Sequence, residues 1–430
     1  MNLTSRLQNA LSTERLNLLK TVADEAFALG RPIYIVGGSV RDLVLGRLLN
    51  DFDLTVEGNA IALARGLAKK RGGKVTAHTK FGTAKWFLPE HLTQDTGGHD
   101  TLDLISARSE TYEHPAALPT VKMGNMDDDI RRRDFTINTL AIRLDGSHFG
   151  ELRDDFNAMD DLDKGIIRVL HLRSFLDDPT RMYRAVRYAV RYGFQITEDT
   201  LALIPDARSL IEKLSAQRIR HELDLMLEEE TAASMLEWLN ELGLLKPIHP
   251  ALSFDESAGP HLGNLRAFRD LQRISPWNID KGDINRPALG WLLWLMPLSH
   301  AEIESLNSRL QFTADLLGSL IAASSIFAGI SSFASLQPSQ CVERLGLYPL
   351  SAVEAVYFVS QDEKTKDVFF KYLSEWRHVK PHTTGDDLKE RGLEPGPKYG
   401  EILRRLRAAW LDGQITSKEQ ESKLLNELLL

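Results

Sequence analysis

A pair of glycines directly after a short apolar segment constrains the fold of this chain most. Residues 32–36 (Pro-Ile-Tyr-Ile-Val) are mostly β-branched or aromatic and predict a buried strand. Gly37 and Gly38 end that strand, and Ser39 is a candidate N-cap for the helix that follows. Free backbone N–H groups at a helix start attract phosphate, and Arg41 adds a guanidinium group. The segment therefore predicts a phosphate-binding turn.

Two carboxylates follow the predicted helix within one short extended segment. Asp51 and Asp53 lie in residues 51–56, which are rich in β-branched and apolar side chains. Because side chains alternate along a strand, both carboxylates would lie on one face, with Phe52 and Leu54 on the other. Two oxygen ligands on one face suit Mg²⁺, which completes its shell with water and substrate phosphate. An Asp-x-Asp alone is usually a solvated strand end, but beside the glycine turn it predicts a metal site for nucleotide transfer.

The spacing of apolar residues predicts a mixed α and β region followed by a helical one. Strands are expected at residues 32–36, 51–56, 74–78, 84–88, 101–106 and 139–143. Residues 3–29 predict one amphipathic helix, and beyond about residue 160 the helical period dominates. We therefore expect an α+β head with a mixed sheet, ending near Leu144, and all-α parts after it. Loops at 247–260 and 378–385 are candidate boundaries within the helical part.

Composition places the chain among soluble globular proteins, with 43% hydrophobic and 26% charged residues. The uncharged segment Leu316–Leu336 is long enough to span a bilayer, but its serines predict two buried helices joined by a turn. The apolar segment 291–296 is too short to span a bilayer and is predicted to lie in the hydrophobic core. The single cysteine, Cys341, excludes an internal disulfide and fits a reducing cytoplasm. We therefore expect a cytoplasmic protein with no membrane span.

The net charge of −8 is unusual for a protein that binds RNA, because phosphate contacts require basic surface. A local basic patch can still serve. Candidates are Lys69–Arg71, the arginines of 181–191, and Lys389, Arg391, Lys398, Arg404, Arg405 and Arg407 of the C-terminal part. The C-terminal charges are equally well explained as a solvated helix face.

The glycine turn and the carboxylates belong to a wider set of motifs. Gly37–Arg47 with Asp51-Phe52-Asp53 resembles the head of the bacterial-type (class II) tRNA nucleotidyltransferase and poly(A) polymerase family, within the DNA polymerase β superfamily. Further blocks agree with the family in order and spacing. Arg132–Asn138 resembles its hinge motif, and Asp177–Arg181 with Arg184, Arg187 and Tyr188 resembles its nucleobase-reading helix. Arg218–Leu223 resembles a neck motif, and Gly392–Gly400 is a weaker match. The resemblance implies a nucleotidyltransferase head at 1–144, a neck at 145–246, a helical body at 247–377 and a tail at 378–430 with tRNA contacts.

A third catalytic carboxylate would complete a two-metal site. Asp103 is the best candidate, because residues 102–106 predict another strand with an acid among apolar neighbours. The family match from Asp103 through Arg108, Glu110 and Tyr112 strengthens this assignment. An ordinary solvated strand residue is the alternative.

Arginines near these carboxylates are candidate partners for a nucleoside triphosphate. Arg108 and the run 131–133, Arg132 among them, carry guanidinium forks that pair with phosphate. Asp129 and Glu110 are weaker candidates for polar contacts in the same cleft. The resemblance implies that Asp134 holds the head–neck junction rather than a metal ion.

Selection of the incoming base falls to an acid and an arginine. Asp178 and Arg181 are three residues apart on a predicted helix and would share a face. A carboxylate that accepts and a guanidinium that donates match the Watson–Crick edges of cytosine and adenine, whereas uracil and guanine present the reverse pattern. An ordinary helix salt bridge is the alternative. Arg184 and Arg187 belong to the same implied nucleotide-binding set, whereas position 177 has aspartate where the family usually has glutamate.

The first interpretation is a Mg²⁺-dependent tRNA nucleotidyltransferase that adds C and A, from CTP and ATP, to the tRNA 3′ end without a template. The 3′-hydroxyl would attack the α-phosphate and release pyrophosphate. Alternatives within the family are a CC-adding or A-adding enzyme and a poly(A) polymerase. Alternatives from other classes are a small-molecule nucleotidyltransferase and a catalytically inactive RNA-binding relative.

Overall fold

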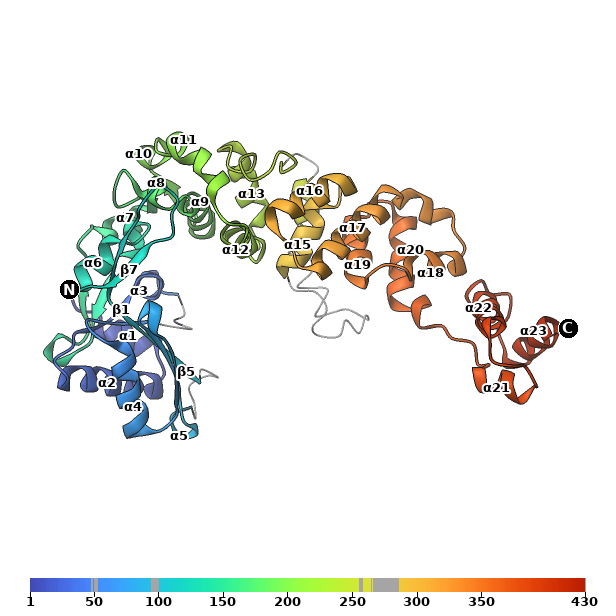
Figure 1. Cartoon of the computed structure of the whole chain (residues 1–430), viewed down its shortest axis with the longest axis horizontal. Helices are drawn as coiled ribbons and strands as arrows, with labels where there is room; N and C mark the ends of the chain where they lie inside the picture. Colours follow the sequence, from blue (N-terminus) through green and yellow to red (C-terminus); the bar gives the residue numbers. More distant parts are fainter. Residues whose placement is uncertain are drawn as a thin grey trace. The chain divides into compact units, whose positions relative to one another are not determined.

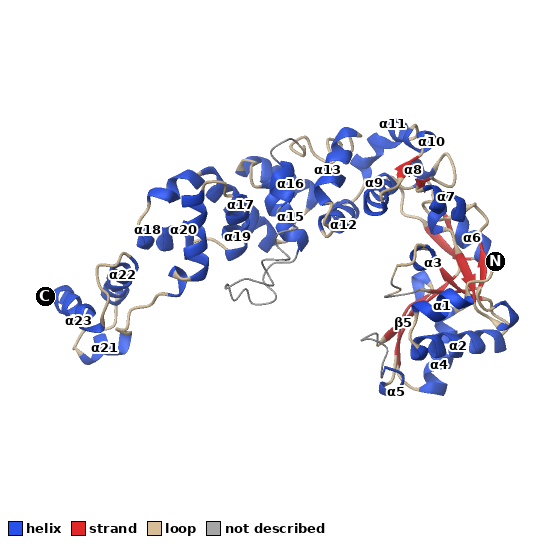
Figure 2. Ribbon diagram, turned by 180° about the vertical axis from the view of Figure 1, so that it is seen from behind, coloured by secondary structure: helices blue, strands red, loops and turns tan. Residues whose placement is uncertain are grey.

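The computed structural model describes residues 1–47, 49, 53–93, 100–254, 258–263, 265 and 286–429. These residues form two compact units, Met1–Leu214 and Ser215–Leu430. The first unit contains the β-sheet with helices around it, and the second is built from helices (Figures 1 and 2). This agrees with the predicted α+β head and the predicted change to helix.

The main sheet of the first unit has seven strands in the order β3-β4-β5-β2-β1-β8-β9. Their bounds are β1 Ile33–Val36, β2 Leu54–Val56, β3 Lys74–His78, β4 Thr83–Phe87, β5 Thr101–Ser106, β8 Ala141–Arg143 and β9 Glu151–Arg153. β2 and β5 run parallel and the other described neighbours run antiparallel, so the sheet is mixed, as predicted. The predicted strands are confirmed to within two residues, except that β2 begins at Leu54 and Asp51 and Phe52 lie outside the described residues.

Helices cover the sheet and extend the first unit. They are α1 Thr4–Ala10, α2 Thr13–Ala28, α3 Gly38–Val44, α4 Ala60–Arg71, α5 Glu90–Thr93, α6 Met126–Arg131, α7 Ala158–Lys164, α8 Ser174–Asp177, α9 Thr180–Tyr192, α10 Glu198–Leu201 and α11 Ile204–Ala207. The single helix predicted over 3–29 is wrong, because Ser12 caps a new helix by accepting from the backbone N–H of Arg15. Leu7 of α1 and Leu19 and Val22 of α2 are nevertheless buried, as the apolar spacing indicated.

Two small sheets complete the first unit. The hairpin of β6 (Arg108–Thr111) and β7 (Thr120–Met123) is antiparallel. Its tip contacts α8, because the backbone N–H of Ala116 donates to the carbonyl of Leu176 at 3.0 Å. β10 (Ile166–Ile167) and β11 (Gln195–Ile196) form a short parallel pair beyond residue 160, where no strand was predicted.

The second unit is a succession of helices. They are α12 Ala216–Leu227, α13 Ala232–Glu241, α15 Arg286–Leu295, α16 His300–Leu310, α17 Ala314–Ala328, α18 Pro338–Leu345, α19 Leu350–Val359, α20 Glu363–Ser374, α21 Gly385–Glu390, α22 Pro397–Leu411 and α23 Lys418–Leu429. Trp291 and Trp294 of α15 are buried and stack with ring centroids 5.5 Å apart, which confirms the predicted core there. Trp291 also donates to Asp224 Oδ1 of α12 at 2.6 Å.

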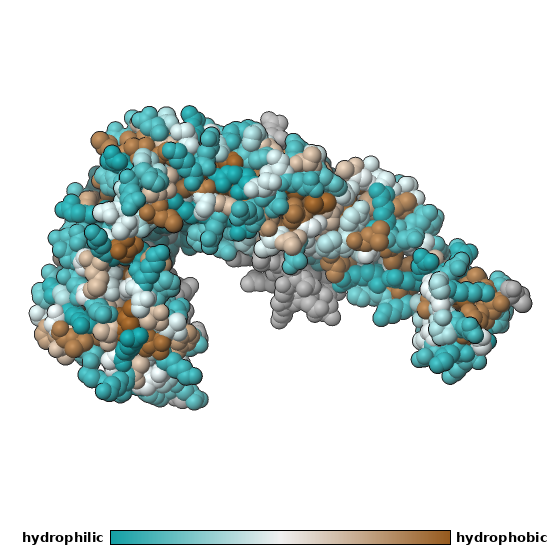
Figure 3. Space-filling model, in the orientation of Figure 1, coloured by the Kyte–Doolittle hydropathy of each residue, from teal (hydrophilic) through white to brown (hydrophobic). Residues whose placement is uncertain are grey.

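The uncharged segment 316–336 forms most of α17 and then a 3₁₀ helix over Ile330–Ser335. Ser324 is buried and donates to the carbonyl of Leu298 at 2.6 Å, so the serines of this segment serve packing between helices. Among the described residues, no helix is long and apolar enough to cross a membrane. Figure 3 shows polar residues over much of the visible surface, with separate small apolar patches.

Glu421 of α23 holds the C-terminal helices together. Its side chain is buried and accepts hydrogen bonds from the backbone N–H groups of His382 and Thr383 and from Trp410 Nε1. Burial alone would raise the pKa of this carboxyl, but the hydrogen bonds from Thr383 and Trp410 outweigh it and lower the pKa. The segment before α21 is thus tied to α22 and α23.

Candidate active site

Gly37 forms the turn between β1 and α3. Its φ of +67° is left-handed, and a Cβ at this position would lie 2.3 Å from Arg133 Nη1. Glycine is therefore required both by the backbone and by the arginine that fills the space. Helix α3 begins at Gly38 with Gly37 as its N-cap, so the prediction that Ser39 caps the helix is wrong. The left-handed turn starts the helix two residues earlier than an N-cap at Ser39 would.

The described carboxylates lie at the parallel pair of the sheet. Asp53 is exposed and immediately precedes β2, and Asp103 is a half-buried residue of β5. Leu54 pairs with Leu104, so the preceding residues, Asp53 and Asp103, are also neighbours across the strands. Asp103 Oδ2 lies 3.3 Å from Lys85 Nζ. Within the described part of the chain, to which Asp51 does not belong, no three His, Cys, Asp or Glu side chains are grouped to hold a metal ion.

A polar cleft of about 370 Å³ lies in the first unit. It is lined by Gly38, Arg41, Arg108, Glu110, Tyr112, Arg132, Arg133, Asp134, Asn138, Asp178, Arg181, Arg184 and Tyr188. Seven predicted site residues are therefore brought together: Gly38, Arg41, Arg108, Arg132, Asp178, Arg181 and Arg184. The lining does not include Gly37, Ser39, Asp53, Asp103 or Arg187; Arg187 is buried with its guanidinium 4.9 Å from the Tyr188 ring.

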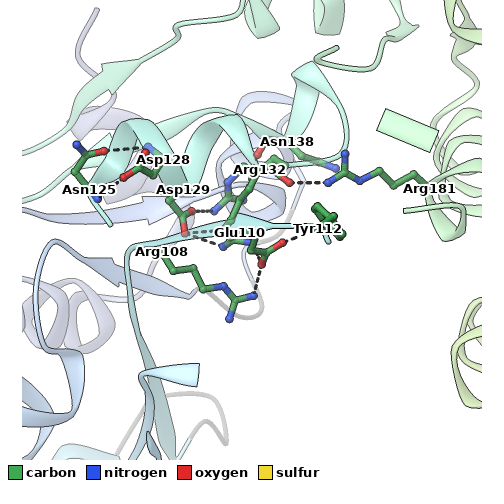
Figure 4. Close-up of polar contacts among 10 residues, drawn as sticks. Arg108, Glu110, Tyr112, Asn125, Asp128, Asp129, Arg132, Asn138 and Arg181 are labelled. Atoms are coloured by element: carbon green, nitrogen blue, oxygen red, sulfur yellow. Dashed lines mark hydrogen bonds and ion pairs between the residues drawn. The ribbon is translucent and has the colours of Figure 1, made fainter. Parts of the chain in front are cut away.

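Asp129 of α6 fixes two arginines of the cleft (Figure 4). Its side chain is fully buried; one oxygen lies 2.7 Å from Arg132 Nη2 and the other 2.8 Å from Arg133 Nη2. Arg133 Nη1 also donates to the carbonyl of Asn138. Burial opposes ionisation of Asp129, but Arg133 and Arg132 outweigh it and lower the pKa of its carboxyl. Arg132 and Arg133 are therefore held by a buried, ionised acid.

Glu110 of β6 contacts three side chains of the cleft, those of Arg108, Arg132 and Tyr112, as Figure 4 shows. Glu110 Oε1 lies 3.1 Å from Arg108 Nη2 and 3.2 Å from Arg132 Nη1, and Oε2 accepts from the Tyr112 hydroxyl at 3.2 Å. Burial, then the charge of Arg132, lower the pKa of Arg108, and burial with Glu110 raises the pKa of Tyr112 to about 12. Sequence reasoning did not place Tyr112 in the site, although the alternation of 108, 110 and 112 along a strand was the available signal.

The guanidinium group of Arg41, predicted to pair with phosphate, is buried and already has several partners. Its side chain is 6% exposed, Nε and Nη2 donate to Asp42, and Nη1 donates to Asn138 Oδ1 at 2.6 Å. The guanidinium carbon also lies 5.2 Å from the Tyr188 ring centroid and 4.6 Å from that of Tyr192. Arg41 thus joins α3 to α9 at the edge of the cleft.

Asp134 joins the segment after α6 to α9. Oδ2 lies 2.6 Å from Arg184 Nη2, and Oδ1 accepts from Asn138 Nδ2 and from the backbone N–H of Phe135, both at 2.9 Å. Burial disfavours the charged form, but Arg184 and Asn138 outweigh it and lower the pKa to about 2. Asp134 therefore contacts α9, a contact that fits the predicted role at the head–neck junction.

Asp178 and Arg181 both line the cleft, but they do not share a helix. Asp178 precedes Pro179, has extended backbone (φ −135°, ψ 98°) and accepts from the N–H and hydroxyl groups of Thr180 at the start of α9. Arg181 is 5% exposed; it donates to Ser174 Oγ at 2.8 Å and to the carbonyl of Arg132 at 2.7 Å. The prediction that both residues lie on one helix face is therefore wrong, although both reach the same cleft.

Comparison with protein families matches two regions of the chain. Residues 33–168 match the poly A polymerase head domain, and residues 193–255 match the probable RNA and SrmB-binding site of polymerase A. The A-adding tRNA nucleotidyltransferase of Halalkalibacterium halodurans is 31% identical over 99% of this chain and 95% of its own length. The A-adding enzyme of Geobacter sulfurreducens is 33% identical over 94% of this chain, which spans only 46% of that relative. The CCA-adding enzyme of Leuconostoc mesenteroides is 26% identical over 90% of both chains.

Solved structures agree with this result. A CCA-adding enzyme without ligand matches with a TM-score of 0.84 and 29% identity, covering all of this chain and 98% of the other. The Thermotoga maritima CCA-adding enzyme complexed with tRNA matches with a TM-score of 0.78 and 27% identity, over all of this chain and 98% of the other. A CCA-adding enzyme complexed with ATP matches with a TM-score of 0.81 and 27% identity, covering 100% of this chain and 99% of the other. The chain therefore belongs to the bacterial-type tRNA nucleotidyltransferase and poly(A) polymerase family. It is a nucleotidyltransferase, of a family that uses divalent metal ions.

Proposed function

We propose that this protein adds C and A, from CTP and ATP, to the 3′ end of tRNA without a nucleic-acid template. The observation that carries the proposal is the cleft in which Arg108, Arg132 and Arg133, the arginine wall, lie together with Asp178 and Arg181. Relatives with the same fold are described as complexes with tRNA, ATP or CTP, which supports these substrates. The proposed tRNA substrate fits the predicted cytoplasmic localisation. The division into head, neck, body and tail with the predicted boundaries is part of the same proposal.

Mg²⁺ would be bound by Asp51 and Asp53, with Asp103 as the third carboxylate. The neighbouring positions of Asp53 and Asp103 fit this assignment, because carboxylate oxygens on adjacent strands suit a hard cation. When bound, Mg²⁺ would lower the pKa of the attacking 3′-hydroxyl and neutralise charge on the leaving pyrophosphate. The protein itself contributes position: Asp103 is held near Lys85, on strands paired over five residues.

The arginine wall would bind the triphosphate. Arg108 and Arg132 are only partly exposed, with 23% and 18% of their side chains accessible, and both face the cleft. Guanidinium groups with restricted motion lose little entropy when they pair with phosphate oxygens. At the start of α3, Gly38 lines the cleft and would add a backbone N–H group, whereas the N–H of Gly37 already donates to the carbonyl of Leu140 at 2.9 Å.

Asp178 and Arg181 would read the incoming base. Arg181 is oriented by Ser174 and the carbonyl of Arg132, and Asp178 by Thr180, so each group is fixed independently. A carboxylate acceptor beside a guanidinium donor suits cytosine and adenine, and leaves buried polar groups unpaired with uracil or guanine. Each unpaired group costs about 1–3 kcal/mol, which gives the selectivity. Arg184, bound to Asp134, and Arg187, beside Tyr188, would support this wall.

A specific observation favours a second candidate, addition of the terminal A alone. The relatives described as A-adding are 31–33% identical over 87–99% of this chain, against 26% for the CCA-adding relative from Leuconostoc. The site chemistry described above fits both activities, because an A-adding enzyme also binds ATP and a tRNA end.

Three tRNA transcripts separate these candidates. The purified protein is given transcripts that end before CCA, after one C and after both Cs, with CTP and ATP separately and together. Extension of the first transcript by C, C and A is expected. Use of only the transcript ending in both Cs would assign the A-adding activity, and long A tails would assign a poly(A) polymerase.

Substitution of Asp178 tests base reading. Asp178→Ala should reduce discrimination against UTP and GTP more than it weakens triphosphate binding, because selectivity depends on which groups remain unpaired. Arg181→Ala should act in the same direction. Asp206→Ala, an exposed acid of α11, is the matched control and should leave selectivity unchanged. Full preference for CTP and ATP in both cleft variants would make the two residues structural.

A further inference from the structure

Two acids hold the arginine wall, and they hold it differently. Asp129 is fully buried and binds Arg132 and Arg133 at 2.7 and 2.8 Å through separate oxygens. Glu110 lines the cleft, is 8% exposed and offers one oxygen to both Arg108 and Arg132 at the longer distances of 3.1 and 3.2 Å. An anion in the cleft can therefore replace Glu110, whereas Asp129 lies behind the arginines and stays bound.

Arg108 depends on Glu110 when the cleft holds no anion. Its Nε atom is buried without a hydrogen-bond partner among the described residues, and its Nη2 atom forms an ion pair with Glu110 Oε1. Burial and the nearby charge of Arg132 both disfavour the charged form of Arg108. Loss of a bound anion without a replacement would leave Arg108 uncompensated beside Arg132, which stays paired with Asp129.

We propose that Glu110 competes with pyrophosphate for Arg108 and Arg132 and so assists release of the product. This inference rests on the proposed function, in which the same arginines bind the triphosphate. When pyrophosphate dissociates, the Glu110 carboxylate forms ion pairs with the guanidinium groups of Arg108 and Arg132. These ion pairs offset part of the free-energy cost of dissociation. The Tyr112 hydroxyl, bound to the other oxygen, keeps the carboxylate directed at them. Glu110 is thus a positioning residue that weakens product binding.

Binding of inorganic pyrophosphate to the full chain tests this directly. Calorimetry at fixed Mg²⁺ concentration compares the wild type with Glu110→Gln, which keeps size and hydrogen-bond acceptance but removes the charge. We expect the variant to bind pyrophosphate about three- to tenfold more tightly, and pyrophosphate to inhibit its CTP incorporation at correspondingly lower concentration. Glu113→Gln is the matched control, because Glu113 is exposed, lies three residues further along and does not line the cleft. Its affinity should equal that of the wild type.

Unchanged or weaker pyrophosphate binding by Glu110→Gln would overturn the inference, as would equal tightening in Glu113→Gln, which indicates a general charge effect. Tyr112→Phe provides an independent variant if Glu110→Gln does not fold. This variant removes the hydroxyl that orients the Glu110 carboxylate, so pyrophosphate should bind more tightly, by a smaller factor than in Glu110→Gln. Weaker binding would contradict the inference. A wild type that incorporates no nucleotide and binds no pyrophosphate would instead refute the proposed function.

Discussion

Replacing Asp134 with asparagine should destabilise the first unit by a predictable amount. Lowering the pKa of this carboxyl from 3.8 to about 2 corresponds to roughly 2 kcal/mol of stabilisation of the folded state, because each pKa unit is worth about 1.4 kcal/mol. Asp134→Asn removes the charge that pairs with Arg184 and places an amide N–H where an acceptor is needed. For a unit of this size, the melting temperature should fall by roughly 4–8 °C.

The pH dependence distinguishes this cause from ordinary packing damage. Since the folded-state pKa lies below the unfolded value, the stabilisation is present above about pH 4 and is lost as the pH falls towards 2. Scanning calorimetry of the wild type and the variant at pH 7, 5, 4 and 3 should show a constant difference down to pH 4 and a smaller one below. Asp163→Asn, an exposed acid of α7, is the control. A difference near zero at pH 7, or one that grows as the pH falls, would refute the reasoning.

Three further substitutions test other parts of the molecule. Asp53→Asn should lower incorporation of CTP and ATP by about a hundredfold or more with tRNA binding retained, as measured by filter binding; activity like that of the wild type would remove Asp53 from the metal site. Gly37→Ala should cost about 1–3 kcal/mol and raise KM for both triphosphates, because the left-handed backbone is strained and Arg133 is displaced; unchanged melting and KM would contradict this. Glu421→Gln should expose residues 378–430 to faster limited proteolysis, because its three partners lose a charged acceptor, and an unchanged cleavage rate would speak against that role.

The sequence indicated the sheet well, because its signals are local. Apolar and β-branched runs predicted six of the seven strands of the main sheet, all except β9, and seven of the predicted site residues line one cleft. Asp178 was misplaced although a local signal existed, since the residue before a proline is disfavoured in a helix. The break at Ser12 was likewise readable as a helix cap within an otherwise continuous apolar period.

The contacts of the cleft could not be read in the same way. Arg108 and Glu110 meet Arg132 only because a hairpin lies beside α6, and Arg133 fills the space left by Gly37 from a distant segment. Such contacts depend on tertiary packing, about which the periodic pattern of apolar residues in the sequence carries no information. The predicted set of residues was therefore closer to the structure than the predicted pairing among them.

The parallel pairing of β2 with β5 determines when the acid pair can form during folding. Leu54 and Leu104 are fifty positions apart, and α4, β3 and β4 lie between their strands. Closing so long a segment costs chain entropy, so this contact belongs to the slower steps of folding. A nascent chain that has emerged only to residue 100 carries Asp53 without its neighbour Asp103. The face of the sheet that carries Asp53 and Asp103 is thus completed only when the chain beyond β4 has been synthesised, well after the glycine turn has left the ribosome.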